Sequence, residues 1–258
     1  MPTSKPPRRV PANGAGSDGN PMRNLILLGL PADEIDSLRK KLVFVELPTK
    51  FVLLEAAQPI KFVRFMSGGL ASVLNMMTDG KSVEVGLAGK EGFVGLPIVV
   101  GVSTSATRVI IQVKGSAYRM TSKDFVEILP QCPELEKHLN RFALHLGNQA
   151  IHVATCNRLH EVDERLARWL LMSQDRLGGN IVPLTQEFLA HMLGTRRASV
   201  TVAAGILQKS GLITYTRGEV KIDNRTGLED AVCECYAAMT EQMRNWEKEA
   251  DGVGTLPD

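Results

Sequence analysis

The spacing of apolar residues changes along the chain, and the changes predict different secondary structure in successive segments. Residues 24–42 have apolar positions at helical spacing, interrupted by Pro31. Residues 43–120 alternate apolar and polar positions in short runs, which predicts strands. The expected strands are 43–47, 51–54, 62–66, 70–76, 82–87, 107–113 and 117–120, with glycine turns at 67–69, 79–80 and 114–115. Many short antiparallel strands in one segment are typical of a β-roll or barrel.

A long helix is predicted over residues 133–160. Its apolar positions recur in steps of four and three, which gives a seam of Leu135, Leu139, Phe142, Leu146, Gln149, Val153, Cys156 and His160. Such a seam fits pairing with a second copy of the helix, and it also fits one buried helix packed on the roll. If the seam pairs with a second copy, the roll can be met by a second apolar stripe on the same helix. This stripe consists of Ala143, Ala150, Ile151 and Ala154.

Residues 162–177 continue as another helix, which we expect to direct Leu166, Trp169 and Leu170 toward the segment that follows. The turn at 160–163 between the two helices is a predicted hinge.

Two short helices joined by a tight turn are predicted between Thr185 and Ile213. Gly194 ends the first helix, whose apolar face is Leu189, Met192 and Leu193, and Thr195 is placed to cap the second. The second helix presents Val200, Ala203, Ala204 and Leu207 inward, and Arg196, Arg197, Ser199 and Thr201 near its exposed start. This pattern fits a helix-turn-helix, in which arginines reach guanine edges or phosphates in the major groove. An ordinary helical hairpin with two solvated arginines is the alternative.

Two short strand patterns follow the second helix. They consist of Leu212, Ile213, Tyr215, Val220 and Ile222 around a turn at Arg217 and Gly218. A hairpin in this place turns the helix pair into a winged helix, with Arg217 at the tip where it can touch a phosphate.

Charge supports this division of the chain. Residues 184–222 carry five basic residues against two acidic ones, whereas residues 226–258 carry eight acidic residues against two basic ones.

The 258 residues are 44% hydrophobic and 22% charged, which is ordinary for two globular domains. The longest apolar run, 93–102, is too short to span a membrane, and the N-terminus lacks the apolar stretch of a signal peptide. We therefore expect a cytoplasmic protein with reduced thiols.

The run from Thr185 to Ile213 resembles the DNA-binding domain of the Crp/Fnr family of bacterial transcription regulators. The matching residues are Thr185, Gly194, Arg197, Ser199, Val200, Leu207, Leu212 and Ile213. The resemblance implies an α+β fold with an N-terminal antiparallel β-roll, a long dimerisation helix and a C-terminal winged helix-turn-helix. The expected divisions are a disordered tail at 1–23, the sensory roll at 24–132, the dimerisation helix at 133–160, the DNA-binding domain at 161–225 and a helical extension at 226–258.

The implied function is that of a homodimeric regulator that reads a palindromic site in double-stranded DNA, with no catalytic role and no cofactor. The expected DNA contacts are Thr185, Thr195, Arg196, Arg197, Ser199, Thr201 and Arg217. The acidic C-terminal helix is a candidate contact for RNA polymerase, although such a face is often only solvated. The alternative function is a ligand- or redox-sensing module that acts through a protein partner. The sequence offers no Ser-His-Asp set, phosphate-loop lysine or carboxylate pair that would favour an enzyme.

Residues 89–95 resemble the start of the family's phosphate-binding cassette. The implied effector pocket consists of Gly92, Phe93, Gly95, Thr104, Ser105, Ala150 and Ile151. In members that bind cyclic AMP an arginine stands at the place of Thr104, and a Thr-Ser pair stands at the place of Ala150 and Ile151. A buried phosphate without a counter-charge is costly. We therefore expect that cyclic AMP does not control this protein, and the sequence does not name another effector.

Cysteine placement bears on metal binding. No cysteine precedes Cys132, so the N-terminal cluster of the family's iron–sulfur members is missing. His152, Cys156 and His160 recur every four residues and could hold a metal or haem, but three half-buried residues in a helix seam explain them more simply. Cys233 and Cys235, if helical, point to different sides of the helix. We therefore assign no metal site.

Overall fold

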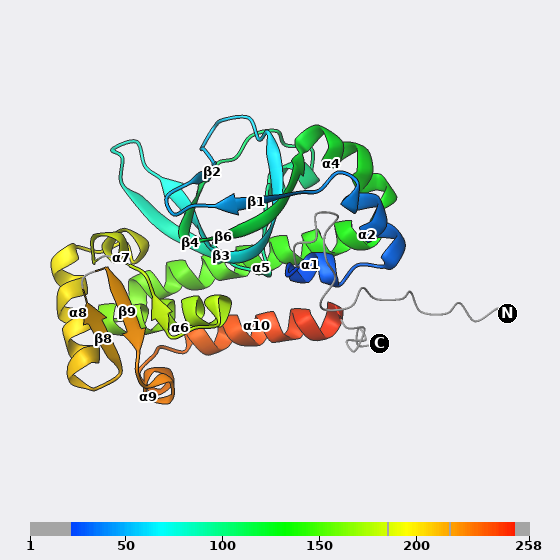
Figure 1. Cartoon of the computed structure of the whole chain (residues 1–258). Coiled ribbons are helices and arrows are strands. Elements are labelled where there is room, and N and C mark those ends of the chain that lie inside the picture. The colour runs from blue at the N-terminus through cyan, green and yellow to red at the C-terminus, as the bar shows by residue number, and fades with distance from the viewer. Residues whose placement is uncertain (1–21, 185, 217, 251–258) are drawn as a thin grey trace.

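The computed structural model describes residues 22–184, 186–216 and 218–250 (Figure 1). The tail predicted at 1–23 lies largely outside these residues, but its last part is folded because the side chain of Met22 is fully buried. Two short helices follow, α1 (Leu25–Leu28) and α2 (Ala32–Arg39). Asn24 caps α1 and donates hydrogen bonds from Nδ2 to the carbonyl oxygens of Met66 (2.8 Å) and Gly92 (2.9 Å). The first helix is therefore fixed to the roll.

The N-terminal domain is an antiparallel β-roll, as the sequence predicts. Its strands are β1 (Val43–Leu47), β2 (Val52–Leu54), β3 (Phe62–Met76), β4 (Ser82–Ala88), β5 (Phe93–Val94) and β6 (Arg108–Thr121). The sheet order is β1-β6-β3-β4, with β2 paired to β6 and β5 paired to β3. The helices α3 (Leu96–Val99) and α4 (Ser122–Ile128) and a 3₁₀ turn (Leu129–Gln131) complete the domain.

The turns predicted at 67–69 and 114–115 are wrong. Each lies inside a continuous strand, β3 or β6, where the pairing shifts register and the two strands bend together. Gly69 has a φ of +78°, and a Cβ there would lie 2.5 Å from the carbonyl oxygen of Val113. Glycine is needed at this position for a bend and for the close approach of two backbones, and both uses look like a turn in the sequence.

Long helices connect the roll to the C-terminal part. The helix α5 (Pro133–Leu159) runs beneath the roll, and α6 (Val162–Leu177) follows after a break at His160 and Glu161. The winged helix consists of β7 (Ile181–Val182), α7 (Gln186–Met192), α8 (Arg197–Lys209), β8 (Ile213–Thr216) and β9 (Glu219–Ile222). After α9 (Arg225–Asp230), α10 (Cys235–Ala250) returns along α5 and α6 (Figure 1).

The two stripes of α5 do not divide as predicted: Ala143 and Ala150 of the second stripe line the cavity between the roll and α5, whereas Ile151 is exposed. The predicted dimer seam packs inside the protomer, since Leu139, Phe142 and Cys156 are fully buried. The exposed apolar positions are instead Leu144 (66% exposed), Ile151 (63%) and Leu159 (69%). Both stripes repeat with a period near seven residues, so spacing alone does not show which one meets the roll.

Apolar packing forms two main cores. One fills the roll and takes in the first half of α5, including Leu135, Leu139 and Phe142. The other joins the outer face of the roll to α6 and the winged helix, and it includes the predicted contacts Leu166, Trp169 and Leu170. Among the helices of the described residues, none combines the length and the hydropathy that crossing a bilayer requires.

Candidate functional site

The turn between α7 and α8 is fixed by backbone hydrogen bonds around Gly194. Gly194 has a φ of +57°, and the amide of Thr195 donates to the carbonyl oxygen of Ala190 (3.0 Å). These features define a Schellman motif that ends α7. The prediction that Thr195 caps the second helix is therefore wrong, because Thr195 belongs to the end of α7 and the N-cap of α8 is Arg196, without a side-chain cap.

The helix α8 divides into a buried and an exposed face as predicted. Val200, Ala203, Ala204 and Leu207 are buried against the second core. Arg196, Arg197 and Thr201 are exposed, whereas Thr195 and Ser199 are half-buried. The Thr201 hydroxyl donates to the carbonyl oxygen of Arg197 (3.1 Å). The start of α8 thus presents two cations and a hydroxyl group, which are suitable for phosphates and base edges.

The hairpin of β8 and β9 forms the predicted wing. Its register pairs Ile213 with Ile222 and Thr216 with Glu219, and Gly218 at the turn has a φ of +93°. The sequence did not indicate the third strand, β7, which pairs with β9 through only two residues and has no periodicity of its own. The DNA contacts predicted at Thr185 and Arg217 lie outside the described residues.

The helix α6, which leads into the winged helix, is attached to the roll by polar contacts. The indole Nε1 of Trp169 donates to Glu84 Oε1 (2.8 Å), and Arg176 pairs with Glu91 across 2.7 Å. Burial raises the pKa of Glu84 to about 7, opposed by hydrogen bonds from Ser72 and Trp169. Glu84 lies on β4 and Trp169 on α6, so a titratable group occupies the junction of the two domains.

A further cleft of about 930 Å³ separates the tip of the roll from the helix-turn-helix. Its wall on the roll includes Lys81 and Val83, and the opposite wall includes Arg196, Arg197 and Ser199. Four of the predicted DNA contacts therefore line this cleft, namely Thr195, Arg196, Arg197 and Ser199.

A cavity of about 340 Å³ between the roll and α5 occupies the place of the predicted effector pocket. Four predicted residues line it, namely Phe93, Gly95, Ser105 and Ala150. Gly92, Thr104 and Ile151 do not line it. Thr104 pairs with Pro59 in a β-bridge, and Ile151 points away on the exposed face of α5. Residues that the sequence analysis missed are apolar ones from β2, β3, β4 and α5, namely Leu54, Val73, Val85, Phe142 and Leu146.

The chemistry of this cavity is almost wholly apolar. The only polar side chains that line it within the described residues are the hydroxyls of Ser105 and Thr107. Arg108, the nearest arginine in sequence, pairs instead with Glu55 across 3.3 Å. A cyclic phosphate would therefore meet no cation here.

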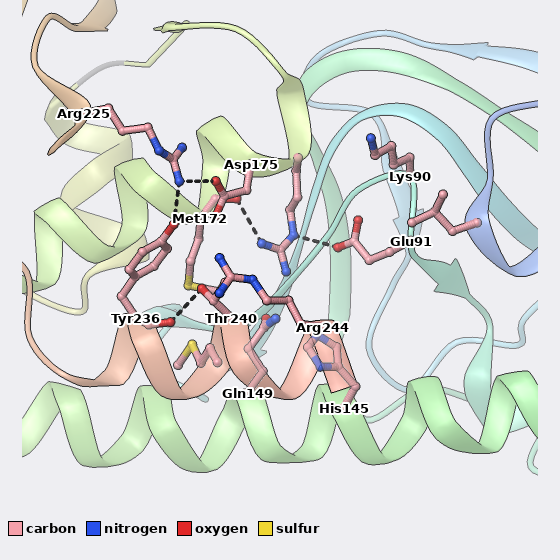
Figure 2. Close-up of a pocket in the computed structure, with 13 residues that line it drawn as sticks. Lys90, Glu91, His145, Gln149, Met172, Asp175, Arg225, Tyr236, Thr240 and Arg244 are labelled. Carbon is pink, nitrogen blue, oxygen red and sulfur yellow. Dashed lines mark hydrogen bonds and ion pairs between the residues drawn. The ribbon is translucent and has the colours of Figure 1, made fainter. Parts of the chain in front are cut away.

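A second cavity, of about 250 Å³, is lined by side chains of α5, α6 and α10 (Figure 2). Figure 2 shows Arg225 bonded to both Asp175 and Tyr236, and the Tyr236 hydroxyl lies 3.0 Å from Asp175 Oδ2. Burial lowers the pKa of His145, in the same wall, to about 4, so that its imidazole is neutral at pH 7. Tyr236 belongs to the first turn of α10, and these bonds fasten that turn to α6.

Three cysteines and one histidine come together where the end of α5 meets the start of α10. Cys156 and His160 at the end of α5 meet Cys233 and Cys235 at the start of α10, and the four possible ligand atoms all lie within 4.8 Å of one another. His152 is not a member of this group. Cys233 lies in the turn before α10, so the expectation that Cys233 and Cys235 point to different sides of one helix is wrong.

The sulfur atoms of the group interact directly. A hydrogen bond between the thiols of Cys156 and Cys233 (3.6 Å) is the first cause that lowers the pKa of Cys156 to about 4 and raises that of Cys233. Arg168 further lowers the pKa of Cys156 through its charge, and its Nε donates to the Cys156 sulfur (3.3 Å).

These features define a class of protein in which a β-roll domain is joined by a long helix to a winged helix-turn-helix. Residues 164–231 match the family model of the Crp-like helix-turn-helix domain. No curated protein matches the chain in sequence.

Several solved structures share the fold. A regulator from Eubacterium rectale that is ascribed to the Crp/Fnr family aligns with a TM-score of 0.63 at 14% identity, over 78% of this chain and 94% of that one. FixK2 from Bradyrhizobium japonicum aligns with a TM-score of 0.64 at 14% identity, over 74% of this chain and 98% of that one. A CRP-family transcriptional regulator from Thermus thermophilus aligns with a TM-score of 0.61 at 16% identity, over 72% and 95%. Residues 164–231 therefore form a Crp-like helix-turn-helix domain, and the chain has the fold of solved Crp/Fnr-type regulators, as the sequence predicts.

Proposed function

We propose that the protein is a homodimer that binds a palindromic site in double-stranded DNA and acts by binding rather than by catalysis. The observation that carries the proposal is the start of α8, where Arg196, Arg197 and Thr201 are exposed while the rest of the helix is fixed by its buried face. A rigid helix with exposed cations at its N-terminal end suits entry into a major groove.

The exposed apolar stripe of α5 supports the homodimer. Leu144 and Ile151 are seven residues apart, and Gly147 lies between them on the exposed side. Large exposed apolar side chains in such a row are typical of a helix that pairs with its copy. A two-fold axis along this face gives two recognition helices whose half-sites lie about 34–36 Å apart.

The cavity between the roll and α5 supports control by something other than cyclic AMP. Its hydroxyl groups and apolar walls suit a small apolar molecule better than an anion. The exposed carboxylates of Glu229 on α9, Glu241 on α10 and Glu234 in the turn between them give an acidic surface that can meet a basic partner, and RNA polymerase is the candidate.

Selection of bound fragments from random duplex DNA tests this function. The expected result is enrichment of a two-fold symmetric sequence with half-sites one helical turn apart, and binding that weakens steeply as salt rises. Absence of any enriched sequence, with and without cell extract, would favour a sensory module that acts through a protein partner.

A further inference from the structure

The four side chains that meet between α5 and α10 have the composition of a metal site. Cys156, Cys233 and Cys235 are buried, and His160 is half-buried. They come from two segments that are far apart in sequence: Cys156 and Cys233 are 77 positions apart. Three thiols and one imidazole form a donor set that structural zinc sites use.

The distances between the donor atoms fit a single tetrahedral ion. Zinc–ligand bonds of about 2.3 Å to sulfur and about 2.0 Å to nitrogen place two sulfur ligands about 3.8 Å apart, and a sulfur and a nitrogen about 3.5 Å apart. The structure has 3.6 Å between the sulfurs of Cys156 and Cys233, and 3.6 Å between the Cys235 sulfur and His160 Nδ1. Two donor pairs therefore stand at ligand spacing, and all four atoms lie within 4.8 Å of one another.

The orientation of His160 is a second, independent observation. His160 is the C-cap of α5, and its Nδ1 faces the cysteines while Nε2 lies 3.1 Å from Glu234 Oε2. A metal-binding histidine usually donates its other ring N–H to a carboxylate or a carbonyl oxygen, which fixes the tautomer and the ring. Glu234 stands between two of the cysteines in sequence and is placed for this role.

Charge around the group is also suitable. Arg168 is only 3% exposed, and its hydrogen-bond acceptors are the sulfurs of Cys156 (3.3 Å) and Met172 (3.4 Å). A buried cation needs a nearby negative charge. A divalent ion bound to three thiolates and a neutral imidazole carries a net charge of −1, and this charge would balance the guanidinium.

We propose that Cys156, His160, Cys233 and Cys235 bind one zinc ion, with Glu234 orienting His160. The ion joins the end of α5 to the start of α10, next to the break between α5 and α6. In a four-iron cluster each ligand binds a different iron, and this spreads the ligands further apart than a single ion does. The compact spacing therefore favours one ion.

Metal analysis of the full-length protein tests the site without reference to DNA binding. After purification under reducing conditions we expect close to one zinc per chain. The apo-protein, prepared with a chelator and titrated with Co²⁺, should develop the intense visible bands of tetrahedral cobalt and a near-ultraviolet thiolate charge-transfer band, and Zn²⁺ should abolish both.

Variants assign the ligands. Cys235→Ser and His160→Gln should each lower zinc content and cobalt affinity at least tenfold. Cys132→Ser, another buried cysteine, and His152→Gln, two turns before His160 on the same helix, are the controls and should keep one zinc per chain. If the ligand variants misfold by circular dichroism, the cobalt spectrum of the unaltered protein still decides the question.

Three outcomes would overturn the proposal. The first is less than about a tenth of an equivalent of zinc after reconstitution, with all four thiols free to react. The second is a disulfide between Cys156 and Cys233 in protein purified under reducing conditions. The third is iron with acid-labile sulfide in place of zinc.

Discussion

The indole of Trp169 on α6 donates a hydrogen bond of 2.8 Å to the carboxylate of Glu84 on β4, and both side chains are buried. The bond joins the segment matched by the helix-turn-helix model to the strand that borders the cavity between the roll and α5. Ser72 also donates to Glu84, so the carboxylate is held from two sides. Glu84 is thus a point at which a change of charge acts on the junction between the two domains.

Stability should depend on pH through Glu84. Burial raises the pKa of this carboxyl from 4.5 to about 7, so the folded protein keeps a proton between these values that the unfolded chain releases. The free energy of unfolding should therefore fall by about 3 kcal/mol as pH rises through this window, and Glu84 should make it neither rise nor fall with pH above or below the window. Urea unfolding of Glu84→Gln should lack this slope. The control Glu127→Gln, on the exposed side of α4, should retain it; equal slopes in all three proteins would contradict the assignment.

Dimer formation should depend on the exposed stripe of α5. Leu144→Glu combined with Ile151→Glu should give monomers in sedimentation, because the interface would have to bury two charges. Val126→Glu, a comparably exposed apolar residue on α4, is the control and should leave the dimer intact. A dimer that survives the double substitution would place the interface elsewhere.

Cyclic AMP should not bind with useful affinity. The cavity offers a cyclic phosphate two hydroxyl groups and no cation, since the nearby Arg108 is turned toward Glu55. Calorimetry should detect no heat of binding at micromolar concentrations of the nucleotide. A dissociation constant in that range would show that the phosphate finds a charge that this structure does not present.

The bend shared by β3 and β6 gives a stability test with its own control. Gly69→Ala should cost about 3 kcal/mol or more, because the residue has a positive φ and the new methyl group would press on the Val113 carbonyl. Gly80 has a similar φ of +83° but open space around it, so Gly80→Ala should cost only about 1 kcal/mol. If both variants lose the same free energy of unfolding in chemical denaturation, the contact with the neighbouring strand adds nothing to the cost of a positive φ.

The comparison of sequence and structure shows which features local patterns reveal. Helical spacing and Gly194 were sufficient to predict the helix-turn-helix, because both act within a few residues. The glycines at 68–69 and 115 were misassigned because the bend depends on contact between two strands. The seam of α5 was assigned to the dimer because both stripes are apolar and only packing against the roll distinguishes them.

The group of three cysteines and one histidine could not be found from the sequence for a similar reason. Cys156 and His160 carried the correct helical spacing, but their partners lie more than 70 positions away, beyond the winged helix. Treating Cys233 and Cys235 as helical concealed them, since Cys233 precedes the first turn of α10. Distant residues of this kind are brought together only when α10 packs back on α5.

The central claim is that α8 reads DNA sequence, and the affinity of Arg197→Ala for single-base variants of the selected site tests it most directly. We expect a loss of about 1–3 kcal/mol on the preferred site and a relaxed preference at one position of each half-site. Arg217→Ala should weaken binding to all variants alike and should reduce the slope of log affinity against log salt concentration by about one. Lys209→Ala, at the far end of α8, is the matched control on the same helix. If Arg197→Ala weakens every variant equally, Arg197 contacts phosphate and the assigned frame of α8 is wrong; if it changes neither affinity nor preference, α8 does not read DNA through this residue.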